Sequence, residues 1–86
     1  NLGLTAGYIA KMNQINHAQT QLQDLRDRLK EIRIAKRWIQ DYRINASPPE
    51  RNALAAYYNH LCEQEEKTCN MGKRIRAELE QHHPSH

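Results

Sequence analysis

Ser47-Pro48-Pro49-Glu50 is the stretch of this 86-residue chain that decides the fold. A residue that precedes proline avoids the α-helical region, so one helix has to end just before Pro48. Ser47 is a good N-cap, Pro48 fits the first helical position, and Glu50 can return a hydrogen bond to the Ser47 amide. The stretch therefore predicts a chain reversal over residues 45–48 between two antiparallel helices.

Upstream of this turn, residues 5–44 are predicted to form one long helix with Thr5 as its N-cap. Steps of three and four alternate along an apolar seam at Ile15, Ala18, Leu22, Leu25, Leu29, Ile32 and Ile39, with Lys36 at the remaining step. This period is typical of a coiled-coil or bundle helix. At 1.5 Å per residue such a helix is about 60 Å long, and this length favours a bundle.

Downstream of the turn, residues 48–81 are predicted to form the second helix and residues 82–86 a tail. Its seam is predicted at Leu54, Tyr57, Tyr58, Leu61, Glu65, Thr68, Gly72, Ile75 and Leu79. The three central positions are polar or small. Polar residues at such positions often set register or oligomer state, while local wetting and fraying is the alternative interpretation.

The fold class predicted from these features is all-α: an antiparallel, coiled-coil-like, two-helix hairpin formed by a single domain over residues 1–86. Hydrophobic residues make up 38% of the chain and aromatic residues only 6%, so the core has to be a narrow seam. A chain of this size buries a smaller fraction of its surface than a larger domain does. We therefore expect it to dimerise into a four-helix bundle.

A second apolar line on the first helix, formed by Ile34, Trp38 and Tyr42, is offset from the seam by part of a turn. A helix with two apolar stripes faces two neighbours, so these three residues are the predicted protein-interaction surface. The alternative is that Trp38 covers the closed end of the hairpin against Tyr57 or Tyr58. In either case Trp38 is the residue most worth mutating.

Positive charge is concentrated in the first helix, because residues 1–46 hold eight Lys and Arg against four acids, and residues 47–86 hold five against six. Arg26, Lys30, Arg33 and Arg37 form one line at helical spacing, with Arg43 beyond it. Such a line suits the phosphates of a nucleic-acid backbone. The alternative is a solvated face that neighbouring acids partly neutralise.

Metal and catalytic signatures are missing from the sequence. Cys62 and Cys69 are two turns apart on a helix, about 10.5 Å of rise, which a disulfide does not span. No CxxC pair occurs, the one HxxxH spacing, His82 to His86, falls in the predicted tail, and GxSxG, P-loop, HExxH and GxGxxG motifs do not occur. We therefore predict free thiols, with a disulfide across the axis of a symmetric dimer as the alternative, and we predict no metal, no cofactor and no enzymatic activity.

The compartment follows from the same features. Free thiols are typical of a reducing environment, so we expect a cytoplasmic protein. No apolar run approaches the roughly 18 residues that a membrane span needs, and we expect no membrane partner.

Three functions are compatible with these features. The first is a non-enzymatic protein-interaction or assembly module, either a homodimer or a small adaptor or inhibitor that docks onto a larger complex. The alternative is a small nucleic-acid-binding protein that uses the basic line. The third is a fragment of an enzyme whose pocket lies on chain outside these 86 residues.

Overall fold

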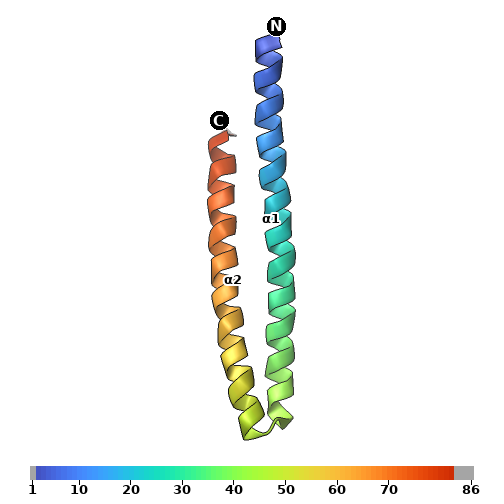
Figure 1. Ribbon diagram of the computed structural model, residues 1–86, viewed down its shortest axis with the longest axis vertical. Coiled ribbons are helices and arrows are strands. Elements are labelled where there is room, and N and C mark those ends of the chain that lie inside the picture. Colours follow the sequence, from blue (N-terminus) through green and yellow to red (C-terminus); the bar gives the residue numbers. More distant parts are fainter. Residues whose placement is uncertain (1, 83–86) are drawn as a thin grey trace.

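The computed structural model describes residues 2–82 as a rod of two antiparallel helices (Figure 1). Helix α1 spans Leu2–Tyr42, a 3₁₀ turn η1 spans Arg43–Asn45, and helix α2 spans Pro48–His82. The rod measures 70 × 20 × 17 Å. Across the described residues all regular secondary structure is helical and only Ala46 and Ser47 lie outside a helix, so the predicted all-α hairpin is confirmed.

The turn follows the local chemistry of its residues. Ala46 is extended and its amide donates to the Arg43 carbonyl at 3.2 Å, which closes η1. The Arg51 amide donates to the Ser47 carbonyl at 2.8 Å and begins α2. The Ser47 hydroxyl donates to a carboxylate oxygen of Glu50 at 2.8 Å, so these two residues pair through their side chains.

The helix ends differ slightly from the predicted bounds. Helix α1 begins at Leu2, so Thr5 lies inside the helix and its prediction as the N-cap was wrong. Gly3 weakens a helix but does not block it, and no proline stops the helix before Thr5. The η1 turn ends α1 at Tyr42 rather than at residue 44, and α2 extends to His82. The rest of the predicted tail lies outside the described residues.

The core is the narrow seam that the apolar period predicts. Its buried apolar residues are Ile15, Leu22, Ile32, Ile39, Ala46 and Leu61. Ile32, Ile39 and Leu61 form one cluster, against which Leu54 and Tyr58 pack. Tyr57 is an exception to the predicted seam, because it is 52% exposed. Its neighbour Tyr58 occupies the seam position, and the helical period turns Tyr57 away from it.

Two of the three central positions of the α2 seam, Thr68 and Gly72, are buried. Thr68 is only 3% exposed, and its hydroxyl donates to the Gln64 carbonyl one turn earlier at 2.7 Å. This bond satisfies a buried hydroxyl without a partner on α1. Gly72 is buried as well. Local wetting is therefore not the explanation for these two positions.

Cross-seam contacts define the register of the hairpin. Gln40 of α1 lies opposite Tyr58 of α2, and Arg33 lies opposite Glu65. Near the open end, Gln21 and Glu78 line the same groove. Because α1 is longer than α2, its N-terminal turns project beyond the end of α2 (Figure 1).

Gly72 provides a test of how closely the helices approach. A Cβ added there would lie 4.0 Å from Cδ2 of Leu22, which is ordinary van der Waals contact. Alanine is favoured over glycine inside a helix by about 1 kcal/mol. We expect Gly72→Ala to raise the free energy of unfolding by about this amount in urea denaturation followed by circular dichroism.

The matched control is Gly7→Ala, where an added Cβ meets nothing within 4 Å. Gly7 lies on the projecting turns of α1, so we expect its substitution to change global unfolding less. A loss of stability in Gly72→Ala would mean that α1 and α2 pack more closely than in this structure.

Candidate interaction surface

The second apolar line on α1 is exposed along its whole length. Ile34 is 61% exposed, Trp38 58% and Tyr42 47%. Steps of four residues place the three side chains in one row along the helix. We call these three residues the apolar row.

Trp38 and Tyr42 form the rigid end of the apolar row. Their rings are stacked, with centroids 4.9 Å apart and an angle of 14° between the planes. The Tyr42 hydroxyl donates to Glu50 of α2 at 3.3 Å, which ties this end of the row to the turn. Trp38 therefore stacks on Tyr42 of its own helix, and the exposed part of its indole faces solvent.

Other large apolar side chains are exposed that sequence reasoning did not assign to a surface. They are Tyr8, Ile9 and Met12 on the projecting turns of α1, Ile44 in η1, and Tyr57 and Met71 on α2. Tyr57 stacks on His60, with ring centroids 6.4 Å apart. The signal for Tyr57 was available in the sequence, since a helix of this period buries only one of two adjacent tyrosines.

Four of the five predicted basic residues line one shallow groove on α1. Arg26, Lys30, Arg33 and Arg37 surround a groove of about 580 Å³ whose apolar lining is Leu29 and Ile34. Ile34 therefore belongs both to this basic groove and to the apolar row. The two surfaces that the sequence analysis treats separately are continuous.

Arg43 lies apart from the basic groove. It lines a second groove, of about 730 Å³, between the two helices near the closed end, together with Arg51 and Ile44. The Arg51 guanidinium donates to the Ile44 carbonyl at 3.5 Å. The structure thus divides the five predicted basic residues between two grooves.

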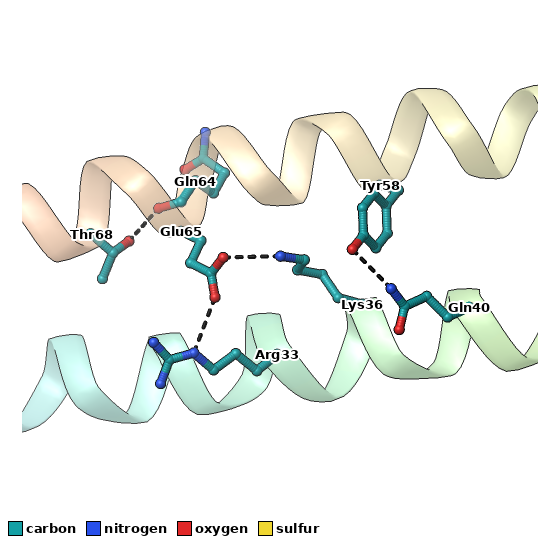
Figure 2. Close-up of polar contacts among 7 residues, drawn as sticks. All are labelled: Arg33, Lys36, Gln40, Tyr58, Gln64, Glu65 and Thr68. Atoms are coloured by element: carbon teal, nitrogen blue, oxygen red, sulfur yellow. Dashed lines mark hydrogen bonds and ion pairs between the residues drawn. The ribbon is translucent and has the colours of Figure 1, made fainter.

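Glu65 is the charged centre of the seam, and Figure 2 shows it extending from α2 between two cations of α1. Lys36 Nζ donates to Oε1 of Glu65 at 3.0 Å, and Arg33 Nε donates to Oε2 at 3.0 Å. The Glu65 and Lys36 side chains are largely covered, whereas Arg33 is mostly exposed. Lys36 also lies over the Tyr58 ring, 5.2 Å from its centroid.

These contacts shift the protonation of both partners. The hydrogen bond from Lys36, followed by that from Arg33, lowers the pKa of Glu65 below its ordinary value of 4.5. The hydrogen bond to Glu65 raises the pKa of Lys36 above 10.5. Both shifts favour the charged forms, so the group is an ion pair over the whole neutral range.

Arg33 has two roles in this arrangement. It is one of the walls of the basic groove, and its Nε is bound to Glu65. Only part of its guanidinium is therefore available to an external anion. Within residues 5–81, Arg33 and Lys36 are the only cations that form ion pairs, both with Glu65.

The cysteines and histidines do not form a metal site in the part of the chain that the structure describes. No group of three His, Cys, Asp or Glu side chains there is placed to hold an ion. Cys62 and Cys69 are half-buried free thiols on α2. Neither described helix has an apolar stretch long enough to cross a bilayer.

The fold and these surfaces define the chain as a helical hairpin with a thin core and one mixed apolar and basic outer face. Comparison with protein families, with curated proteins and with solved structures found no match for this chain. A proposal for its function therefore rests on the surfaces themselves.

The Glu65 ion pair predicts a pH dependence of stability. A carboxyl whose pKa is lower in the folded than in the unfolded state stabilises the fold above the unfolded pKa. That contribution is lost as the pH falls through the lowered pKa of the folded state. We expect Glu65→Gln to be less stable than wild type at pH 7, and the gap to shrink as the pH falls well below 4.5.

The measurement is thermal unfolding by circular dichroism at neutral and acid pH. Glu66→Gln is the matched control, because Glu66 is exposed and neighbours Glu65 in sequence. A stability gap for Glu65→Gln that stays constant with pH, or an equal gap for Glu66→Gln, would contradict the assigned ion pair.

Proposed function

We propose that this protein is a non-enzymatic interaction module that assembles through the apolar row of α1. Its partner is a second copy, which completes a four-helix bundle; docking as an adaptor or inhibitor on a larger complex uses the same row. The observation that carries the proposal is the row itself. Ile34, Trp38 and Tyr42 are each about half exposed or more, although a wholly polar outer face would suffice for a solitary hairpin.

The surface area of the rod also supports assembly. The chain exposes 7026 Å², whereas a compact monomer of 10.1 kDa is expected to expose about 5,300 Å². Stable protein interfaces bury about 1,200–2,000 Å² in total, or roughly half of that per partner. The elongated hairpin thus has the surface to form such an interface and remain well solvated.

The titratable groups of the seam support a non-enzymatic role. Lys36 and Glu65 have shifted pKa values, and each shift is explained by the bond between them. The two side chains point toward each other across the seam (Figure 2). Their chemistry stabilises the hairpin and does not present a reactive group to a substrate.

Trp38→Ala tests the assembly function. Tryptophan at the centre of an interface commonly contributes 2 kcal/mol or more, equivalent to a weakening of about 30-fold. We expect the wild type to sediment as a dimer and Trp38→Ala to dimerise about 30-fold more weakly at unchanged helicity.

The control for Trp38→Ala is Ile44→Ala, which removes a side chain that is 68% exposed but lies outside the apolar row. It should sediment as the wild type does. A strictly monomeric wild type that also retains no partner in a pull-down, with Trp38→Ala as the negative control, would refute the proposed function.

Nucleic-acid binding is the second candidate function, and the basic groove favours it. Arg26, Lys30 and Arg37 are exposed along one line, and neutralising phosphates with such residues releases counterions. Leu29 and Ile34 in the groove are apolar, however, and do not bind phosphates. Arg33 is already bound to Glu65. The groove therefore supports this function less directly than the apolar row supports assembly.

The test uses labelled duplex and single-stranded DNA at several salt concentrations. The triple variant Arg26→Gln, Lys30→Gln, Arg37→Gln spares Arg33 and so preserves the Glu65 ion pair. If the groove binds duplex DNA, losing three phosphate contacts should lower the slope of log affinity against log salt by about 2.7.

The charge-matched control removes three cations from α2 instead, as Lys73→Gln, Arg74→Gln, Arg76→Gln. Under nucleic-acid binding through the groove, this variant keeps the wild-type slope. Equal slopes for the wild type and the α1 triple variant would exclude the basic groove as a nucleic-acid site.

A further inference from the structure

The two sides of the hairpin differ in character. Gln40 of α1 and Ala55 and Asn59 of α2 line the closed-end groove, so they mark one side of the seam. Trp38 and Tyr42 are each two residues from Gln40, about 200° round the helix. Tyr57 is likewise two residues from both Ala55 and Asn59.

These angles place the exposed aromatic residues of both helices on the opposite side of the hairpin. We call the side that carries Trp38, Tyr42 and Tyr57 the aromatic side. His60 belongs to it as well, because its ring stacks on Tyr57. At the closed end, the two helices therefore present aromatic rings in the same direction.

Toward the open end of the hairpin, the aromatic side carries charged residues. They form one straight line on each helix. Asp24, Glu31 and Trp38 are spaced by seven residues along α1, which is close to two helical turns. His60, Lys67 and Arg74 are spaced by seven along α2. The α1 line is acidic, and the α2 line is basic.

The register of the hairpin brings these lines to matching levels. Gln40 lies opposite Tyr58, which sets Trp38 level with His60. Arg33 lies opposite Glu65, which sets Glu31 level with Lys67. The same spacing sets Asp24 level with Arg74. Each acid thus has a base at its own height on the neighbouring helix.

The acids and bases that share a level do not form ion pairs with each other within the hairpin. Asp24, Glu31, Lys67 and Arg74 are all exposed, and the ion pairs across the described residues are those of Glu65 with Arg33 and Lys36. The side chains of both lines lie on the part of the aromatic side that is farther from the seam. They face solvent rather than each other.

We propose that the aromatic side binds a second copy of this chain about a two-fold axis parallel to the rod. Such an axis keeps every level, so α1 of one copy faces α2 of the other. Glu31 then meets Lys67 of the partner subunit, Asp24 meets Arg74 of the partner subunit, and Trp38 meets His60 of the partner subunit. This inference rests on the proposed assembly function and specifies its partner, face and orientation.

The pattern of charged and aromatic residues favours the orientation in which the turns of the two copies lie at the same end of the dimer. An axis perpendicular to the rod places each helix against its own copy, so an axis through the level of Glu31 sets Glu31 against Glu31 of the partner subunit and Lys67 against Lys67 of the partner subunit. It also moves the two aromatic clusters to opposite ends. The parallel axis brings the two aromatic clusters together and pairs the acid with the base at both charged levels.

The ion pairs between the two copies determine the orientation of the dimer more than its affinity. Exposed ion pairs contribute little individually, whereas like charges in the wrong arrangement oppose docking. The two-fold axis repeats each pair, so the two levels supply four ion pairs. The aromatic residues at the closed end provide the apolar area that holds the dimer together.

The test is a charge-reversal exchange, measured by sedimentation at low ionic strength. Glu31→Lys places two lysines opposite each other twice in its homodimer, and Lys67→Glu does the same with two glutamates. We expect each variant alone to dimerise roughly tenfold more weakly than the wild type. An equimolar mixture should recover wild-type affinity, because every reversed residue then meets an opposite charge on its partner.

Mixing separates contacts between chains from contacts within one chain, since an internal pair is not repaired by a second molecule. Asp24→Lys mixed with Arg74→Glu then tests the orientation, because only the parallel axis brings these two residues together. Glu63→Lys is the control: it reverses a charge on α2 off the aromatic side, and it should dimerise as the wild type does. High salt should reduce all of the reversal effects.

The outcomes separate this inference from the assembly function. A dimeric wild type whose reversed variants are not rescued by mixing overturns the proposed face and leaves assembly through another surface. Rescue of the Glu31 and Lys67 pair without rescue of the Asp24 and Arg74 pair overturns the parallel axis. A monomeric wild type overturns both the self-assembly and this inference.

Discussion

The bond of Glu65 to Arg33 and Lys36 across the seam is the contact on which the arrangement of the hairpin depends. A seam of leucine and isoleucine packs nearly as well when one helix slides by a heptad, because its apolar contacts are not directional. Such a slide would leave the largely covered carboxylate of Glu65 with one cation in place of two, either Arg26 beside Leu29 or Arg43 beside Gln40, so the two ion pairs favour the observed register. The register then sets how far α1 projects and which residues of the two helices share a level.

Because the seam is narrow, several apolar side chains remain exposed on the outer face of the hairpin. Two helices alone cover only one stripe of each other, and the buried residues lie along that stripe. Any further apolar side chain has to remain exposed or meet another molecule. The stacked pair of Trp38 and Tyr42, tied to Glu50 at the turn, is held in place before any partner arrives. Such pre-organisation reduces the entropy lost on binding.

The apolar row and the basic groove meet at Ile34, so a protein partner and a nucleic acid would compete for the same part of α1. Arg33 links this surface to the interior, because it forms a wall of the groove and also binds Glu65. A change at Arg33 therefore affects both the fold and the surface. The aromatic side differs in this respect, since its charged lines are separate from the ion pair of the seam.

The sequence alone determined the all-α hairpin, the position of its turn and most of its seam, because proline geometry, capping and apolar period act over a few residues. It also located Ile34, Trp38 and Tyr42 as a row off the seam. Only the tertiary structure decided that Thr68 and Gly72 are buried, that Arg43 lies apart from the other basic residues, and which side Tyr57 shares with Trp38. These facts depend on the register between segments distant in sequence, and that register is set by packing and by the partners that Glu65 finds on α1.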